Sequence, residues 1–319
     1  MNMEHFIFIF LDGVGVGKPE DFNPFYVNRP EYLPFYEGGL VLPDGTPIKP
    51  IDATLGVEGI PQSGSGQTSL YTGENIPKLM GHRDSYPSRE MRRIIVEKNI
   101  LSRLKARGMD AVFINAYPVH HYLFTDQHIR LMPSGELQAS AEVLPAYRRR
   151  LSVTSCMMLA AGQPPFTETD ILNGRSLFQD FTNRWLIEKG MRIPEFTPEI
   201  AAQNLFHASR LHDFTLYEYF QTDLYGHRRT FDEQLELIDD LNRFLRTLFS
   251  LLNPKTDTLL LTGDHGNLED GTTRGHTLNP VPLIVWGNQA ERLRDRIHDL
   301  AEVTPAILDH LTGSHSRKD

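Results

Sequence analysis

Apolar residues in this chain recur in the spacings expected of buried strands and amphipathic helices. Strand-like runs lie at 6–11, 110–116, 214–221, 259–262 and 281–286. Helical spacing is present at 89–107 and 231–252, and a last helix is expected at about 290–312. Buried strands that alternate with helices indicate a layered α/β fold. With 319 residues, the chain is long enough to bury a full sheet.

Two long segments lack this pattern. Residues 16–50 are rich in Pro, Gly and Asn and are expected to form surface loops. Residues 119–204 contain no clear strands, and we interpret them as a helical excursion from a core made of about 1–118 and 205–319. Its helical patches are expected around 140–161 and 174–189, on either side of the sequence QPPFTETD.

The segment LLLTGDHGN, residues 259–267, places polar chemistry at the end of one predicted strand. Asp264 and His265 stand side by side there, and His276 follows in a segment that returns to the next apolar run. In an open α/β sheet, ligands bind just outside the carboxyl ends of the strands. An adjacent carboxylate and imidazole at this position therefore suggest a metal site. The alternative is that both side chains only cap a loop.

Other strand ends carry the same types of side chain. Asp12 directly follows the first predicted strand, where it either ligates a metal or caps the loop. Asp223 and His227 follow the third predicted strand, and their spacing of four residues places both on one face of a helical turn. That spacing suits two ligands of one ion. His120 and His121 also lie just past a strand, where an exposed loop position is the alternative to a place in the site.

The stretch IPQSGSGQTSLYTG, residues 60–73, combines small residues with the start of a predicted helix. A tight turn that opens a helix offers unpaired amide groups and a positive dipole end, which suit a phosphate group. Ser63 is well placed there as a nucleophile. In the alternative interpretation, the serines of this turn only cap the helix.

Composition argues against several classes of function. The 41 acidic residues outnumber the 32 basic ones, and the net charge of -9 argues against a nucleic-acid or anionic-membrane surface. Cys156 is the only cysteine, so a metal within one chain must be held by oxygen and imidazole ligands. No stretch approaches the roughly 20 apolar residues of a membrane span, and the first apolar run is too short for a signal peptide. We therefore expect a cytoplasmic protein.

These motifs resemble those of the alkaline phosphatase superfamily, near the cofactor-independent phosphoglycerate mutases and phosphopentomutases. The matching motifs are LDGVG, the serine-containing turn, D-x-x-x-H, and DHGN followed by RGHTLNPVP, and they span roughly 1–80 and 210–310. DATLGV and the PQS-x-x-GQ turn are similar to those of small bacterial "metalloenzyme domain" proteins. The resemblance implies a three-layer α/β/α sandwich with a mostly parallel central sheet, formed as a single domain over 1–319.

The resemblance also implies a site for two divalent metal ions. The implied ligands of one ion are Asp12, Ser63, Asp264 and His265. Those of the second ion are Asp223, His227 and His276. A set of ligands rich in histidine favours Mn²⁺ or Zn²⁺ over Mg²⁺.

The expected function is hydrolysis of a small phosphate ester, with Ser63 as the nucleophile that carries a phosphoserine intermediate. Four candidates for holding the phosphate oxygens are the amides of Gly64 and Gly66 and the side chains of Gln67 and Asn115. No nucleic acid or membrane is expected as a partner.

Two departures from the mutase pattern rank a phosphosugar or phosphoglycerate mutase second. The mutases have a large second domain inserted after the nucleophile, whereas only about 130 residues separate the two motif blocks here. Gln62 and Gln67 stand where the mutase turn has asparagine and histidine. A non-catalytic, metal-holding binding protein ranks third, because the chain retains Ser63 at the start of the helix.

Overall fold

The computed structural model describes residues 4–83, 86–119, 121–125, 127–143 and 150–313. Its centre is a six-stranded sheet with the strand order β2-β8-β7-β1-β6-β3. The strands are β1 (His5–Leu11), β2 (Lys49–Ile51), β3 (Ala111–Phe113), β6 (Phe214–Tyr219), β7 (Asp257–Thr262) and β8 (Val281–Gly287). β1 pairs in parallel with β6 and β7, and β3 pairs in parallel with β6. β8 runs antiparallel to β7 and β2, so the sheet is mostly parallel, as predicted.

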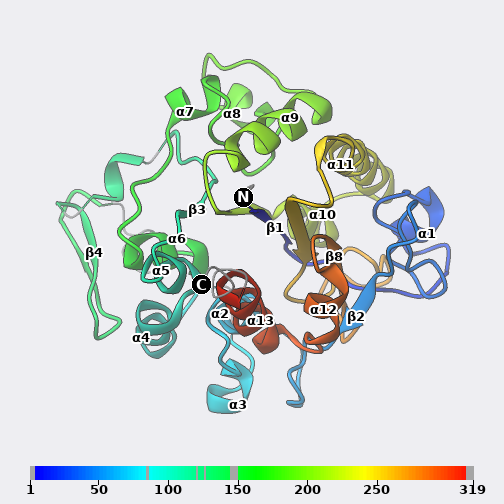
Figure 1. The fold of residues 1–319 in the computed structure, drawn as a ribbon, viewed down its shortest axis with the longest axis horizontal. Helices are drawn as coiled ribbons and strands as arrows, with labels where there is room; N and C mark the ends of the chain where they lie inside the picture. Colours follow the sequence, from blue (N-terminus) through cyan, green and yellow to red (C-terminus); the bar gives the residue numbers. More distant parts are fainter. Residues whose placement is uncertain (1–3, 84–85, 120, 126, 144–149, 314–319) are drawn as a thin grey trace.

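Alternate side chains of β1 separate two hydrophobic layers. The two sets are Phe6, Phe8 and Phe10 on one face and Ile7, Ile9 and Leu11 on the other. The first face is covered by α2 (Ser63–Thr72), α4 (Arg89–Lys98), α5 (Ile100–Lys105), α6 (Val153–Ala160), α12 (Ala290–Asp295) and α13 (Leu300–Gly313). The second is covered by α1 (Pro24–Asn28), α7 (Glu168–Leu172), α8 (Arg184–Glu188), α9 (Pro198–Ser209) and α11 (Phe231–Leu251). Figure 1 shows the two groups on opposite sides of the strands, so the molecule is a three-layer α/β/α sandwich.

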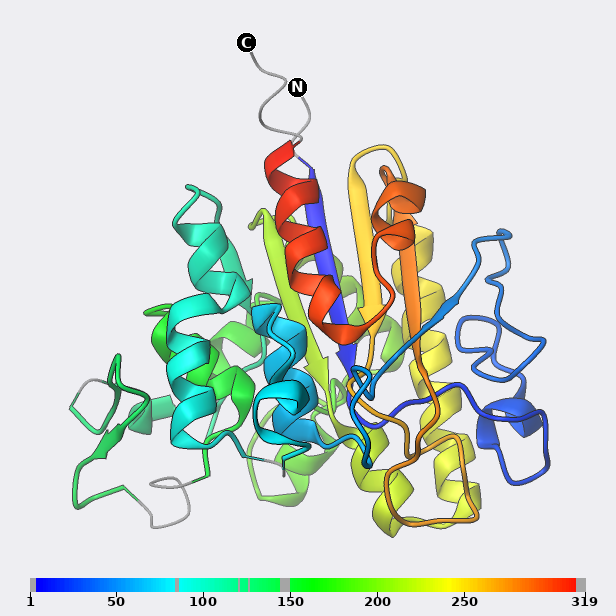
Figure 2. The ribbon, with the colours of Figure 1, turned by 90° about the horizontal axis from the view of Figure 1, so that it is seen from below.

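The carboxyl ends of β1, β6 and β7 meet at one edge of the sheet, at the bottom in Figure 2. α10 (Gln221–Arg228) begins two residues after β6, and the long loop 263–280 connects β7 to β8. The start of α2 lies against the end of β7. A Cβ atom on Gly66 would stand 2.9 Å from the carbonyl oxygen of Asp264, so only glycine permits this approach. The fold thus gathers all the predicted motif segments at one edge.

The excursion at 119–204 contains strands that the sequence analysis missed. β4 (Ile129–Leu131) and β5 (Leu137–Ala139) form an antiparallel pair outside the main sheet. Each has only three residues, too few for a recognisable alternation of polar and apolar positions. Within the predicted patch at 140–161, a helix is described only from Val153 onward, and residues 144–149 lie outside the described part of the chain.

The segment 16–50 is not only a set of surface loops, as the sequence analysis predicted. It contains α1 and the first residues of β2, which pairs with β8. Phe25, Leu33 and Phe35 from this segment are completely buried against the second face of the sheet. Because these buried residues are irregularly spaced, the segment has no periodic pattern of apolar positions.

Two helices predicted as continuous are each divided in two by a polar side chain. Asn99 separates α4 from α5, because its side chain donates to the carbonyl of Ile95 and accepts from the amide of Ser102. Asp299 precedes α13 and accepts from the amide of Glu302, an N-terminal cap. α3 (Ile76–Met80) is a further short helix after α2. In the described residues, no helix has both the length and the apolar character needed to cross a membrane.

Candidate metal centre and nucleophile

Asp12, Asp264 and His265 form one compact cluster at the carboxyl ends of β1 and β7. One potential ligand atom from each lies within 4.8 Å of the others. The Nε2 atom of His265 is 3.4 Å from Oδ1 of Asp12 and 3.6 Å from Oδ2 of Asp264. Asp264 and His265 have no exposed surface, and Asp12 is only 9% exposed. Two buried carboxylates in such proximity repel each other unless a cation lies between them.

Ser63 joins this cluster from the first residue of α2. Its hydroxyl oxygen lies 2.9 Å from Nε2 of His265. Ser65, two residues later, faces elsewhere: its hydroxyl donates to the carbonyl of Gln62 and accepts from the amide of Arg83. Of the two serines in the turn, therefore, Ser63 has its oxygen in the cluster.

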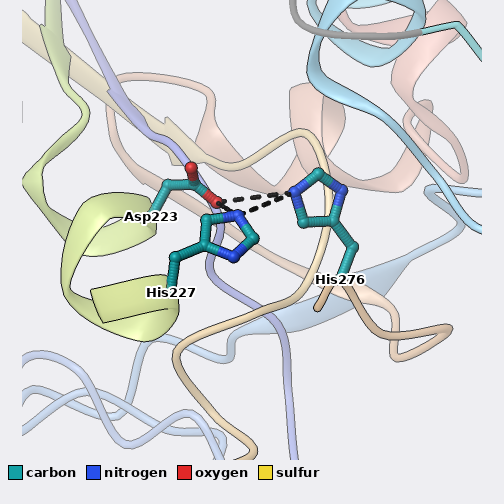
Figure 3. Close-up of side chains that lie close together, drawn as sticks. All are labelled: Asp223, His227 and His276. Carbon is teal, nitrogen blue, oxygen red and sulfur yellow. Dashed lines mark hydrogen bonds and ion pairs between the residues drawn. The ribbon is translucent and has the colours of Figure 1, made fainter. Parts of the chain in front are cut away.

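Asp223, His227 and His276 form a second cluster, shown in Figure 3. Oδ1 of Asp223 lies 3.3 Å from Nε2 of His227 and 3.7 Å from Nε2 of His276, and the two Nε2 atoms are 3.2 Å apart. The first two residues lie on α10, one helical turn apart, as predicted from their spacing. His276 comes from the β7–β8 loop. Three electron-rich atoms from two segments thus converge on one point.

The three imidazoles are oriented in the same way by the backbone. Nδ1 of His265, His227 and His276 faces the carbonyl oxygen of Gly266, Arg274 and Pro61, respectively. A carbonyl oxygen only accepts hydrogen bonds, so Nδ1 carries a proton in each ring, and in the neutral ring Nε2 keeps its lone pair. This is the arrangement found for metal-binding histidines, whose second nitrogen donates to a backbone or carboxylate oxygen.

The donor set fits divalent metal ions. In each cluster, Nε2 atoms face carboxylate oxygens, an arrangement that a bound cation would stabilise. In addition, Oδ1 of Asp12 is buried and has no hydrogen-bond partner among the described residues. A buried carboxylate oxygen without a partner is rare, because removing it from water costs on the order of several kcal/mol. A metal ion would satisfy it.

The electrostatics of the carboxylates agree with this fit. Burial raises the pKa of Asp12 well above its usual range, and the nearby charges of Asp264 and Asp223 raise it further. Burial would also raise the pKa of Asp223, but hydrogen bonds and the charges of nearby histidines lower it to about 2. The first cluster therefore has an excess of negative charge, whereas the second already contains an ionised carboxylate between two imidazoles.

The two clusters touch through their imidazole rings. The rings of His265 and His276 are stacked, with centroids 3.6 Å apart and an interplanar angle of 16°. The ring of His276 also lies 5.1 Å from that of His227. All seven side chains predicted as metal ligands are therefore brought together, in the two groups that the resemblance implied.

Glu269, which was not among the predicted site residues, organises the loop that carries His276. This carboxylate is fully buried and accepts hydrogen bonds from the amides of Gly15 and Asn267 and from the side chains of Thr277 and Asn279. It thus links the loop after β1 to both ends of the β7–β8 loop. A carboxylate in a loop without periodicity carries no sequence signal, apart from its place two residues after the DHGN motif.

Asn267 is a second supporting residue. It lies in the DHGN motif, but no role was predicted for it. Its side-chain amide donates to Oδ1 of Asp223 over 2.9 Å. Two glycines make room for this contact. A Cβ atom on Gly226 would lie 2.3 Å from Oδ1 of Asn267, and one on Gly13, whose φ is +67°, would lie 2.7 Å from Oδ1 of Asp223.

Three of the four predicted phosphate-binding residues have other hydrogen-bond partners. The amide of Gly66 donates to the carbonyl of Gln62, as the first hydrogen bond of α2. The side chain of Gln67 donates to Asp12 and Asp264, so it supports the carboxylates. The side chain of Asn115 pairs with the backbone of Glu218 through both its donor and its acceptor.

The amide of Gly64 remains as the predicted donor to a phosphate group. Within the described residues, the amides of Ser63 and Gly64 have no hydrogen-bond partner, as expected for the first positions of a helix.

His121 lies outside both clusters, in an exposed 3₁₀ turn (His121–Leu123) near the carbonyl of Pro118. His120 lies outside the described residues.

Comparison with known protein families agrees with the chemistry of the clusters. A family model described as "Metalloenzyme superfamily" matches residues 187–314, which include the second cluster, Asp264 and His265. The chain is also similar to the 2,3-bisphosphoglycerate-independent phosphoglycerate mutase of Antithamnion sp., with 26% identity over 132 residues. This match covers 37% of the chain and 26% of the mutase, so the chain spans about a quarter of that relative.

Solved structures share the whole fold. The PH0037 protein from Pyrococcus horikoshii has a TM-score of 0.52 and 14% identity, with 98% of each chain covered. The alkaline phosphatase from the Antarctic bacterium TAB5 has a TM-score of 0.51 and 12% identity, with 98% of this chain and 99% of the phosphatase covered. At these identities, the structures establish the fold alone. The chain thus has the fold of the alkaline phosphatases, and its residues 187–314 are similar to the Metalloenzyme superfamily.

Proposed function

We propose that this protein is a two-metal phosphoester hydrolase that acts through a phosphoserine on Ser63. The observation that carries the proposal is the convergence of three Nε2 atoms on carboxylates that are buried or half-buried, with the Ser63 hydroxyl 2.9 Å from one of those nitrogens. The proposed ligands are Asp12, Ser63, Asp264 and His265 for one ion and Asp223, His227 and His276 for the other. The histidine content favours Mn²⁺ or Zn²⁺ over Mg²⁺.

In the proposed reaction, the Ser63 oxygen forms a bond to phosphorus while the bond from phosphorus to the substrate's ester oxygen breaks. The proton of the serine hydroxyl is lost, and the leaving oxygen gains a proton and departs as an alcohol. Water then cleaves the phosphoserine, which releases inorganic phosphate and restores the hydroxyl. Bound divalent ions would supply the positive charge that stabilises the attacking and leaving oxygens.

The protein's own groups contribute position and additional charge stabilisation. Ser63 is held at the start of α2, where the amides of Ser63 and Gly64 have no partner among the described residues. These donors and the positive end of the helix dipole suit the nonbridging oxygens of a phosphate. Gln67 contributes indirectly, since its amide fixes the carboxylates of Asp12 and Asp264.

A mutase is the second candidate function, because the relatives that the chain matches over part of its length include phosphoglycerate mutases. Intramolecular transfer requires that the alcohol product stays bound while water is excluded. The short excursion at 119–204, between the two motif blocks, favours hydrolysis. A metal-binding protein without catalytic activity is the third candidate function. It ranks last because the oxygen of Ser63, a potential nucleophile, lies within the cluster.

Incubation with phenyl phosphate in the presence of Mn²⁺ or Zn²⁺ tests the proposal. We expect release of inorganic phosphate that depends on the metal and disappears after chelation. The matched assay supplies 3-phosphoglycerate and measures 2-phosphoglycerate and free phosphate together. Efficient interconversion without release of phosphate would make the mutase the better assignment, and absence of both reactions would favour the binding protein.

A further inference from the structure

A cavity of about 530 Å³ lies beside the candidate metal centre. Its volume is within the range typical of pockets for small molecules. The walls come from the ends of β3 and β6, from α10, and from the excursion at 119–204. None of the residues that line it is a metal ligand candidate, so the cavity is a separate feature of the same edge.

α10 forms a wall common to the metal centre and the cavity. Asp223 and His227 occupy one face of this helix, and Leu224 and Arg228, each one position further, line the cavity. Residues offset by one position lie about 100° apart around a helix. The metal centre and the cavity therefore lie on adjoining faces of α10, so a molecule with its phosphate at the metal centre has the cavity beside it.

Aromatic rings make up much of the cavity wall. Phe178 and Trp185 are stacked, with centroids 5.6 Å apart, and Tyr117 lies 4.7 Å from Phe124. Trp185 remains 39% exposed, so its ring is accessible to a ligand. Walls of this kind suit a flat ring, which gains both apolar contact and favourable ring geometry.

The charge of the lining is positive. Among the described residues that line the cavity, there are three arginines, Arg150, Arg228 and Arg229, and one acidic residue, Glu218. Glu218 is almost completely buried and accepts a hydrogen bond from Thr154. Arg229 pairs with Glu233, but the side chain of Arg228 has neither an ion pair nor a hydrogen bond to any other described residue. An exposed, unpaired guanidinium beside an aromatic wall suits a carboxylate or second phosphate group.

We propose that this cavity receives the alcohol part of the phosphate ester, and that this part is a planar aromatic group carrying a second negative charge. The inference rests on the proposed phosphatase function, and it names the substrate class. The rings of Phe178 and Trp185 contact the planar group, and Arg228 binds the second anionic group.

Three synthetic esters test the substrate class: methyl phosphate, benzyl phosphate and 4-carboxybenzyl phosphate. Their leaving alcohols are of similar basicity, so differences in kcat/KM report binding of the organic part. We expect kcat/KM to rise about tenfold from methyl to benzyl and about tenfold again with the carboxylate, which corresponds to one good contact at each step. Equal values for the three esters would overturn the inference and leave the phosphatase function intact.

Arg228→Gln isolates the charge contribution. We expect it to remove the preference for 4-carboxybenzyl over benzyl phosphate, with a metal content equal to that of the parent protein. Arg246→Gln is the matched control, because Arg246 is a half-exposed arginine on α11 that pairs with Glu31 and does not line the cavity. It should keep the preference. An equal loss of kcat/KM for all three esters in Arg228→Gln would instead assign Arg228 to the transferred phosphate and overturn its proposed role.

Binding of the product alcohol provides a readout that does not depend on catalysis. The chain has two tryptophans, so Trp286→Phe leaves Trp185 as the only one. We expect 4-(hydroxymethyl)benzoate to change the fluorescence of this variant in a saturable manner and benzyl alcohol to bind about tenfold more weakly. Saturable binding without phosphate release from any ester would support the cavity while contradicting the phosphatase. Absence of any saturable change would overturn the cavity assignment.

Discussion

Ser63 and Ser65 lie two residues apart in one turn, but their hydroxyl groups have different surroundings. The Ser63 oxygen lies beside His265, whereas that of Ser65 bonds to backbone groups of Gln62 and Arg83. We therefore expect Ser63→Ala to reduce phosphate release by at least about 10³-fold, because no nucleophile remains. Ser65→Ala should instead lower the free energy of unfolding by about 1 kcal/mol, through lost hydrogen bonds.

Mass spectrometry of the trapped intermediate separates these two roles. Acid quenching during turnover should leave a phosphate group on the peptide that contains Ser63, and fragmentation should place it on that residue. The Ser65→Ala protein should give the same labelled residue. A phosphate group on Ser65, or full activity in Ser63→Ala, would show that the nucleophile has been assigned to the wrong serine.

Glu269 offers a second prediction at the scale of single residues. Its two carboxylate oxygens accept hydrogen bonds from four donors. Glu269→Gln replaces one oxygen by an NH₂ group that faces donors, which should lower the free energy of unfolding by about 2 kcal/mol. The loop that carries His276 should loosen, and the content of bound metal should fall. Glu291→Gln, an exposed position on α12, is the control and should change neither quantity in urea unfolding and elemental analysis.

The sequence could predict which polar side chains the fold brings together, but not the residues that hold them in place. Asp12, Asp223 and Asp264 each follow an apolar strand-like run, so the sheet edge where they meet follows from the pattern. Gln67 and Asn115 were predicted to hold phosphate because they lie near that edge. Their actual partners, carboxylates for Gln67 and the backbone of Glu218 for Asn115, depend on distances between segments that no local pattern encodes.

At the scale of elements, α10 is positioned by the contact of Gly226 with the loop after β7. A Cβ atom at Gly226 would lie 2.3 Å from Oδ1 of Asn267, whose amide holds Asp223. Gly226→Ala should therefore displace the helix, lower the free energy of unfolding by about 1 to 3 kcal/mol, and reduce the metal held by the second cluster. Thermal unfolding and elemental analysis would measure both effects.

Gly275→Ala is the matched control for this substitution. Gly275 precedes His276 in an exposed loop, and its nearest atom to an added Cβ is 3.6 Å away. The variant should retain the stability and metal content of the parent protein. If Gly226→Ala behaved in the same way, the close packing of α10 against Asn267 would not be what positions Asp223.

The elements that the sequence failed to predict are those whose existence depends on distant partners. The three-residue strands β2, β4 and β5 are each defined by pairing with another strand. The antiparallel direction of β8 likewise cannot be predicted from its apolar residues, because parallel and antiparallel buried strands have similar composition. Asn99 and Asp299 end or begin helices by capping, a signal that apolar periodicity does not contain.

For the whole molecule, the two clusters join segments that are distant along the chain. Bound ions would hold the loops after β1, β6 and β7 to one another and to α2, so they should stabilise the folded state. At a concentration of 100 times its dissociation constant, one ion adds about 2.7 kcal/mol. For a chain of 319 residues, this raises Tm by roughly 4 °C.

Thermal unfolding with and without Mn²⁺ or Zn²⁺, after prior chelation, measures this stabilisation. A variant with both Asp264→Asn and His276→Ala loses one ligand from each cluster and should show little increase in Tm with either metal. An equal increase in the parent protein and in this variant would mean that the ions bind elsewhere on the molecule.

From the stacked rings of His265 and His276, we expect the two proposed ions to bind cooperatively. An ion that fixes one imidazole plane also restricts the other, so the ordering cost of the second site is already met when the first is occupied. The occupancy curve for Mn²⁺ or Zn²⁺ should accordingly be sigmoidal, with a Hill coefficient above 1. By thermodynamic linkage, each ion raises the affinity for the other by the same factor, typically about 5- to 150-fold. At low metal supply, the protein would then exist mainly with no ion or with both, and seldom with one.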